Sequence, residues 1–257
     1  MRGAVSLLSV DNVGVRFGGV VALDGLTFDV EPGTICALIG PNGAGKTTLF
    51  NVLSRLYQST SGTVRFDGAD LLSVPSHRIA RLGLARTFQN VALFPALTVL
   101  ENVVTGAHAM GHVGIGRAMF RVGAAREERE LRIRCLALLQ RLDLAHLAHR
   151  PVAGLPFGTL KRIEFARALA SEPKLLMLDE PANGLTHGEV DELGATIRSI
   201  RDQFDMTILL VEHHMAMVMA ISDHIVVLDF GRKIAEGPPE VVRNDPAVIE
   251  AYLGAPA

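Results

Sequence analysis

The fold of this chain is decided by the stretch Gly40-Pro41-Asn42-Gly43-Ala44-Gly45-Lys46-Thr47-Thr48. This stretch, called the P-loop below, has the form G-x-x-x-x-G-K-[ST], and its glycines let backbone N–H groups close around phosphate oxygens because no Cβ blocks the approach. Lys46 supplies a positive charge for the β- and γ-phosphates, and the Thr47 hydroxyl suits Mg²⁺. The P-loop therefore predicts a site for a nucleoside triphosphate.

The residues on either side of the P-loop provide the context that the motif needs. Before it, residues 34–39 form an almost unbroken apolar run, which is typical of a strand buried on both faces of a parallel sheet. After it, Leu49, Leu53 and Leu56 recur at helical spacing. A helix that begins here adds free N–H groups and the positive end of its dipole to the phosphate site.

Composition narrows the class of protein. The chain has 257 residues, which is enough for one large α/β domain or for a domain with a lobe, and either can bury a proper core. Its formal net charge is -2 and charged residues make up 20%, so we expect no nucleic-acid partner. We find no tract that resembles a membrane span and no signal peptide. Cys36 and Cys135 lie in apolar segments and are expected to be core residues in a reducing compartment.

The N-terminal part predicts an antiparallel sheet. Residues 7–31 alternate between apolar and polar, which indicates strands joined through Gly18-Gly19 and Asp24-Gly25. Phe17 has two interpretations of similar weight: an ordinary core aromatic, or a ring that stacks on a purine close to the P-loop.

The middle of the chain, residues 97–149, is helical in character. Its apolar stripe contains Leu131, Cys135, Leu138 and Leu142. The segment Leu155-Pro156-Phe157-Gly158-Thr159, called the signature loop below, then opens a further helix with Ile163, Ala166 and Leu169 at helical spacing.

Two later strands end in polar side chains. A buried strand at residues 174–179 ends in Asp179 and Glu180. Asp179 is placed to hold Mg²⁺ at the carboxyl end of the strand, and Glu180 can accept a proton from an attacking water. An acidic turn is common in isolation, but a P-loop in the same chain favours the catalytic interpretation. The next strand, residues 207–211, leads to His213, which can hydrogen-bond a γ-phosphate.

The order of these pieces resembles that of ATP-binding-cassette (ABC) ATPases over the whole chain. The matching positions are Phe17, the P-loop, Gln89, the signature loop, the Asp179-Glu180 pair and His213.

The resemblance implies one ABC ATPase domain over residues 1–257, an α/β P-loop NTPase fold with a mainly parallel core sheet. Residues 1–90 and 160–257 would form the nucleotide-binding core with an antiparallel β subdomain, and residues 91–159 a helical subdomain ending in the signature loop. The implied ligands are ATP and Mg²⁺, with the metal held at Thr47, Gln89 and Asp179.

The resemblance also implies roles for single residues. Phe17 would stack on the base, Lys46 and Gln89 would act at the phosphates, Glu180 would activate water and His213 would steady the γ-phosphate. In such proteins ATP lies between the P-loop of one subunit and the signature loop of a second, so hydrolysis needs a head-to-tail dimer.

Within the superfamily, the chain is most similar to the ATP-binding subunits of branched-chain amino acid importers. The stretches that carry this likeness are residues 86–90, 97–102, 180–185, 211–215, 221–223 and 244–254. The likeness implies a cytoplasmic subunit that is peripheral on the inner face of the cell membrane. Its partners would be a second ATPase subunit, membrane-spanning permease subunits and, indirectly, a solute-binding protein.

Five positions depart from the pattern of the family. The signature loop has Pro156 in place of serine, Phe157 in place of glycine and Thr159 in place of glutamine. Thr186 and His214 stand where acidic or amide residues are usual. Pro156 offers no hydroxyl to a γ-phosphate, so the site that this loop completes in a partner is expected to work less well.

Three alternatives stay open at this point. The transported solute could be urea, an amide or another amino acid, because the ATPase does not select the solute. A soluble ABC protein acting on ribosomes or DNA would normally carry two cassettes or long basic insertions, which this sequence lacks. The unusual signature loop is compatible with a regulatory cassette that barely hydrolyses ATP. The presence of Lys46, Asp179, Glu180 and His213 speaks against this alternative.

Overall fold

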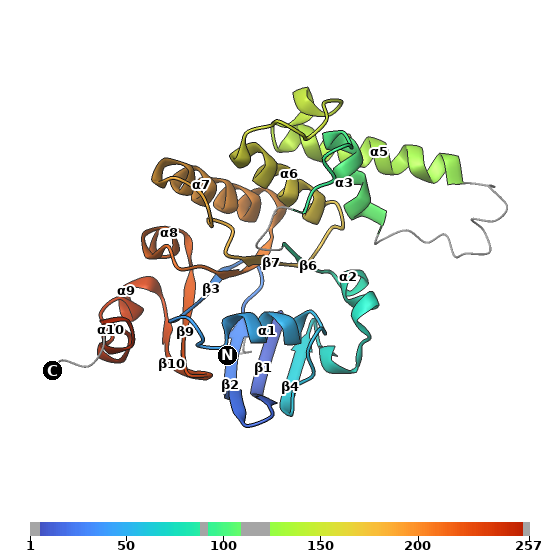
Figure 1. Cartoon of the computed structure of the whole chain (residues 1–257). Coiled ribbons are helices and arrows are strands. Elements are labelled where there is room, and N and C mark those ends of the chain that lie inside the picture. Colours follow the sequence, from blue (N-terminus) through green and yellow to red (C-terminus); the bar gives the residue numbers. More distant parts are fainter. Residues whose placement is uncertain (1–5, 88–91, 109–123, 254–257) are drawn as a thin grey trace, which may run out of the picture. The chain divides into compact units, whose positions relative to one another are not determined.

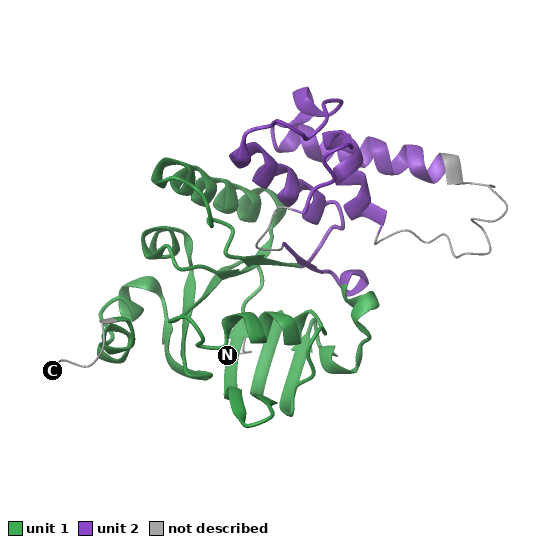
Figure 2. Ribbon diagram, in the orientation of Figure 1, with its two compact units in different colours: residues 1–79, 175–257 green, residues 80–174 purple. Residues whose placement is uncertain are grey.

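The computed structural model describes residues 6–87, 92–108 and 124–253. The chain divides into two compact units, shown in different colours in Figure 2. Unit 1 consists of Met1–Ile79 and Leu175–Ala257, and unit 2 of Ala80–Lys174. The sequence analysis expected the helical subdomain at residues 91–159. Unit 2 is longer than this at both ends, since it starts at Ala80 and ends at Lys174.

Unit 1 contains most of the core sheet, with the strands β10, β9, β3, β8 and β7 as neighbours in this order; all of these but β8 are labelled in Figure 1. Strands β9, β3, β8 and β7 pair in parallel, and β10 is antiparallel to β9. Every residue of β3, β8 and β7 is buried, which is why these segments read as apolar runs in the sequence. The strands are β3 (Ile35–Ile39), β7 (Leu175–Asp179), β8 (Thr207–Val211), β9 (His224–Asp229) and β10 (Arg232–Gly237).

A second, antiparallel sheet of unit 1 has the order β2-β1-β4-β5. Its strands are β1 (Leu8–Phe17), β2 (Val20–Val30), β4 (Ser61–Phe66) and β5 (Ala69–Asp70). The predicted turn at Gly18-Gly19 is confirmed, because it joins β1 to β2. The predicted turn at Asp24-Gly25 is wrong: β2 runs through it, and the pairing shifts there from Val13↔Leu26 to Val15↔Leu23. Gly25 has φ +68°, so the glycine serves a bulge instead of a turn.

The helices of unit 1 include α1, which begins in the P-loop. Leu49 and Leu53 are buried in α1 as predicted, but Leu56 lies beyond the end of the helix and is exposed. The helix ends early because Arg55 has left-handed backbone, with φ +58°. The α-helices that fall in this unit are α1 (Lys46–Leu53), α7 (His187–Phe204), α8 (Met215–Ile221), α9 (Pro239–Val242) and α10 (Pro246–Leu253).

Unit 2 is mainly helical. Its α-helices are α3 (Val99–Ala107), α5 (Ala124–Arg141) and α6 (Phe157–Leu169), with the short helix α2 (Ile79–Leu82) at its start and the strand β6 (Leu84–Arg86) after it. The stripe on α5 is partly confirmed: Leu131 and Cys135 are buried, whereas Leu138 and Leu142 are only partly buried. The third fully buried position is Leu139, so the stripe turns further around the helix than the sequence suggested.

The free cysteines are buried as predicted. Burial raises the pKa of the Cys36 thiol to about 12 and that of Cys135 to about 11, so neither forms a thiolate at neutral pH. Among the described residues, no helix is long and apolar enough to cross a membrane.

Close contact between α3 and α6 depends on Gly106. A Cβ at this position would collide with the backbone carbonyl oxygen of Arg167 on α6, which is backbone and cannot swing away. We therefore expect Gly106→Ala to destabilise the protein by about 1–3 kcal/mol through overpacking. Thermal unfolding of the variant checks this, with a midpoint lowered by several degrees as the expected result.

The matched control is Gly188→Ala on α7, where an added Cβ would meet no atom within 4 Å. Because alanine favours helix over glycine, this change should be neutral or stabilising by about 0.5–1 kcal/mol. Equal midpoints for the two variants would contradict the packing role of Gly106.

Candidate nucleotide site

Gly40, Gly43 and Gly45 of the P-loop all have a positive φ, which only glycine adopts without strain. Gly40 has φ +151° and Gly45 has φ +104°. A Cβ on Gly40 would collide with the backbone oxygen of Leu228, and one on Gly45 would lie 2.6 Å from the backbone oxygen of Ala22. Gly43, by contrast, has nothing within 4 Å of an added Cβ, so the middle of the loop faces open space. The loop therefore has room for a group that approaches its backbone closely.

The first turn of α1 continues the P-loop. Its N-cap, Gly45, has no side chain to accept from the first backbone N–H groups, which stay available for an anion. The Lys46 side chain is only 7% exposed, and its Nζ donates to the carbonyl oxygens of Gly40 (2.7 Å) and Pro41 (2.9 Å). The lysine thus folds back over the loop, and its ammonium group is held at the first two residues of the P-loop.

The electrostatic surroundings of Lys46 connect the P-loop to the two predicted acids. Burial lowers the pKa of Lys46, while the charges of Glu180 and, to a smaller extent, Asp179 act in the opposite direction. This pattern places both carboxylates within electrostatic reach of the ammonium group. The structure thus brings Lys46 within electrostatic reach of Asp179 and Glu180, and their roles at a nucleotide stay a prediction.

Strand register explains why they meet. Val211 at the end of β8 pairs with Leu38 near the end of β3 on one side and with Asp179 at the end of β7 on the other. The carboxyl ends of three adjacent parallel strands thus lie at the same edge of the core sheet. Open α/β sheets bind their ligands at this edge.

Asp179 and Glu180 differ in their surroundings. Asp179 is the last residue of β7 and is buried. Glu180 has left-handed backbone with φ +47°, and its N–H donates to the carbonyl oxygen of Val211 over 2.8 Å. The two consecutive acids therefore differ in backbone conformation and burial, which is compatible with the different roles predicted for them.

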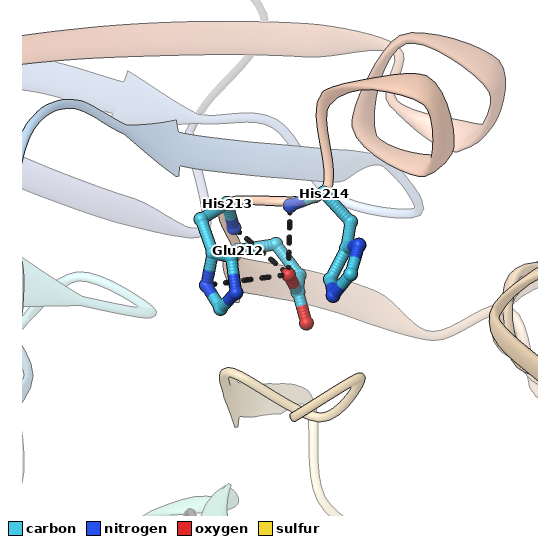
Figure 3. Close-up of side chains that lie close together, drawn as sticks. All are labelled: Glu212, His213 and His214. Carbon is cyan, nitrogen blue, oxygen red and sulfur yellow. Dashed lines mark hydrogen bonds and ion pairs between the residues drawn. The ribbon is translucent and has the colours of Figure 1, made fainter. Parts of the chain in front are cut away.

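His213 follows β8 and has a half-exposed side chain, as a group that contacts a ligand should. Beside it lies a residue whose contacts the sequence did not predict, Glu212, which is 0% exposed (Figure 3). Its Oε2 lies 3.9 Å from Nδ1 of His213, and the rings of His213 and His214 are 4.8 Å apart.

These three side chains could in principle hold a cation, because their ligand atoms lie within 4.8 Å of one another. However, the Glu212 carboxylate already accepts hydrogen bonds from three backbone N–H groups, two from its own loop and one from Ala182. The buried charge is therefore compensated without a metal ion.

Phe17 at the end of β1 is 47% exposed, which disfavours the interpretation as a core aromatic. Its ring meets that of Tyr57 edge-on, with centroids 5.1 Å apart. Tyr57 was missed in the sequence because it follows the helix α1 without any motif around it. The two rings form an exposed aromatic pair of the kind that suits stacking on a base.

The signature loop belongs to unit 2, where it forms the start of α6. The helix begins at Phe157 with Pro156 as its N-cap, and proline offers no side-chain hydrogen bond to the first turn. The first intrahelical bond is donated by the N–H of Leu160 to the carbonyl oxygen of Pro156. The N–H groups of Phe157, Gly158 and Thr159 thus precede the helical ladder, as an anion site requires. Gln89 lies outside the described residues.

Thr186 has a structural explanation. It is the N-cap of α7 and forms a capping box with Glu189, whose carboxylate accepts from the Thr186 N–H and hydroxyl. The Thr186 hydroxyl donates to the Glu189 carboxylate, which an ionised aspartate at this position could not do because it has no proton to donate.

The donor set at the edge of the core sheet also fits Mg²⁺. Thr47 offers an exposed hydroxyl and Asp179 a carboxylate, and both are the oxygen ligands that this ion prefers. With Lys46 and the free N–H groups of α1, the site combines anion-binding and cation-binding groups, as a metal–nucleotide complex demands.

Comparisons with known proteins agree with this site. The family model described as "ABC transporter" matches residues 23–183. The chain belongs to the ABC transporter family. A second family model, described as "Branched-chain amino acid ATP-binding cassette transporter", matches residues 232–257 of this ABC protein.

Curated relatives cover nearly the whole ABC chain. It is 43% identical to the high-affinity branched-chain amino acid transport ATP-binding protein BraF of Pseudomonas aeruginosa, over 96% of this chain and 98% of that protein. It is 42% identical to the corresponding protein LivG of Escherichia coli K12, with the same coverage.

Among solved structures, the ADP conformation of MJ1267, an ATP-binding cassette of an ABC transporter, is 31% identical with a TM-score of 0.85. That likeness covers 97% of this chain and 99% of the other. The predicted family and the predicted fold, an ABC ATPase with a mainly parallel core sheet, are thereby confirmed.

Proposed function

We propose that this chain is the ATP-hydrolysing subunit of an importer that takes up branched-chain amino acids. The observation that carries the proposal is that Lys46 lies within electrostatic reach of Asp179 and Glu180, beside the loop after β8 that carries His213. The relatives named for branched-chain amino acid transport support the choice of solute.

Phosphoryl transfer to water needs positioning and charge stabilisation more than covalent chemistry. Lys46 supplies positive charge to the phosphates and the first N–H groups of α1 donate to them, while Thr47 and Asp179 would hold Mg²⁺, which would supply further positive charge. Gln89 is proposed to take part at the metal. Glu180 accepts a proton from the attacking water, His213 donates to the γ-phosphate, and Phe17 stacks on the base.

The proposed assembly is a head-to-tail dimer in which each signature loop completes the site on the other subunit's P-loop. The N–H groups that precede the ladder of α6 would contact the γ-phosphate across the interface. Permease subunits would hold the dimer on the cytoplasmic face of the membrane, with a solute-binding protein outside. Urea, amides and other amino acids are the competing solutes.

The test is ATP-driven uptake by the chain reconstituted with its permease, ATPase and solute-binding partners in vesicles. We expect uptake of leucine, isoleucine or valine that depends on ATP and is lost with Glu180→Gln. Uptake of urea or amides without uptake of any branched-chain amino acid would overturn the choice of solute, and ATP hydrolysis would still identify the enzyme.

The unusual signature loop predicts unequal sites in a mixed dimer. Pro156 lacks the hydroxyl that serine would donate to phosphate, and a lost hydrogen bond to a charged group costs about 1.5–3 kcal/mol, or tenfold or more in rate. The site made from this chain's P-loop and the partner's signature loop should therefore carry most of the hydrolysis.

The asymmetry is measured by placing the Glu-to-Gln change of the general base in one subunit at a time. We expect Glu180→Gln in this chain to remove most of the turnover and the same change in the partner to remove little. Equal losses would show that backbone N–H groups alone carry the role of the signature loop.

A further inference from the structure

The carboxylate of Glu212 joins the two loops that carry the proposed catalytic side chains. Its Oε1 accepts from the N–H of Ala182 over 2.7 Å. Its Oε2 accepts from the N–H of His213 over 2.8 Å and from that of His214 over 3.1 Å (Figure 3). One side chain therefore holds the loop after β8 and the loop after β7 through separate oxygen atoms.

The hydrogen bond to Ala182 connects Glu212 to the segment that carries Glu180. Ala182 comes two residues after Glu180, whose own N–H is bound to the carbonyl oxygen of Val211 at the end of β8. The segment that carries the proposed general base is thus fixed at two points, once by the backbone of β8 and once by the Glu212 side chain. His213, on the other loop, is fixed by the same carboxylate.

Burial makes the contact directional and strong. Glu212 is 0% exposed, so no water competes for its oxygens, and hydrogen bonds to a charged acceptor gain strength in such surroundings. A buried carboxylate also requires that its donors stay in place, because losing one leaves charge uncompensated. The three donors all belong to the Glu180 and His213 loops.

We propose that Glu212 is a positioning residue for ATP hydrolysis. Its carboxylate holds Glu180 and His213 in one mutual arrangement, so that the proton acceptor and the γ-phosphate donor act on the same phosphate. The inference rests on the proposed ATPase function, and adds a residue that touches neither ATP nor water but acts through two others. ATP binding depends on Lys46 and the P-loop, so it does not depend on this carboxylate.

The experiment uses Glu212→Gln in the purified chain, alone and assembled with its partner subunits. The amide NH₂ must face either the Ala182 N–H or the two histidine backbone N–H groups. Because two donors cannot form a hydrogen bond, the variant loses its hydrogen bonds to one of the two loops. We expect kcat to fall at least about tenfold while KM and the dissociation constant for ATP change less than about threefold.

Two further variants separate positioning from general stability. Glu212→Asp keeps the charge and the nearby histidine N–H groups but is one methylene too short for Ala182, so its kcat should lie between those of Glu212→Gln and the wild type. In a His213→Ala background, Glu212→Gln should cost clearly less than it does in the wild type, since part of its effect passes through His213.

The matched control is Glu101→Gln in unit 2. The Glu101 carboxylate also accepts from a backbone N–H, that of Thr98 at 2.8 Å, but serves only the start of α3. Both Gln variants should lower the unfolding midpoint, and only Glu212→Gln should lower kcat. If Glu212→Gln fails to fold, Glu212→Asp carries the same measurement.

The outcomes distinguish the inference from the function it rests on. A wild-type chain that does not hydrolyse ATP, alone or assembled, would overturn the proposed function. A wild type that hydrolyses ATP together with a Glu212→Gln variant of normal kcat would overturn the positioning role alone. The positioning role would also be overturned if the effects of Glu212→Gln and His213→Ala on kcat were fully additive in the double variant. Equal losses in ATP affinity and in kcat for Glu212→Gln would overturn it as well.

Discussion

Replacing Lys46 with Ala is expected to lower the affinity for ATP by at least about a hundredfold, or about 2.7 kcal/mol. Lys46 is the sole basic residue of the P-loop stretch 40–48, so nothing else in the loop supplies its charge. Its ammonium group is also held in place beforehand by the Gly40 and Pro41 carbonyl oxygens, which reduces the ordering that binding requires. Nucleotide titration of the purified variant measures the loss.

Two further variants test whether the loss of affinity is specific to the Lys46 side chain. Lys46→Arg keeps the charge, but its planar, bulkier head cannot reproduce a compact ammonium group in a buried position, so affinity should still fall. Lys233→Ala is the control, because Lys233 is a partly buried lysine of unit 1 whose Nζ pairs with Glu236 over 2.7 Å. Unchanged ATP affinity in Lys46→Ala would remove this lysine from the site.

The strands that position the site could be predicted because burial on both faces leaves a simple mark on the sequence. Strands β3, β7 and β8 are wholly buried, so each appears as an apolar run that ends at a polar or glycine-rich turn. The P-loop could be predicted because its backbone geometry restricts the residue type. In both cases a local requirement determines local residues.

Features that depend on a partner segment could not be predicted in this way. Asp24-Gly25 suits a turn and a bulge equally, because both need left-handed backbone at the glycine, and only the register with β1 distinguishes them. On α5, the choice between Leu138 and Leu139 depends on which helices pack against it.

Glu212 shows the same limit in the functional site. Its partner Ala182 is 30 residues away in the sequence, and no spacing rule connects them. The one usable signal was an acidic residue at the end of an apolar strand, directly before the predicted His213. A charge at that depth in an α/β sheet needs partners, and the loop after the neighbouring strand is where they are found.

Replacing Glu180 with Gln is expected to lower the turnover of ATP by roughly a hundredfold or more while leaving ATP binding intact. The change keeps the shape of the side chain and removes its ability to accept a proton from water. Its backbone should not move, because the left-handed conformation at φ +47° suits glutamine as well as glutamate and the N–H stays bound to Val211. Steady-state hydrolysis and nucleotide titration measure the two quantities separately.

Glu172→Gln provides the control for this variant. Glu172 has nearly the same backbone conformation, with φ +48°, but lies in unit 2 and pairs at the surface with Arg134. The Glu172→Gln variant should keep full turnover, since neither Glu172 nor Arg134 belongs to the nucleotide site. Glu180→Gln should in addition accumulate as an ATP-loaded dimer, visible by size-exclusion chromatography with ATP, because ATP that is not hydrolysed stays bound between the two subunits of the proposed head-to-tail dimer. Turnover close to that of the wild type would show that another group accepts the proton, and Glu180 would lose its role as general base.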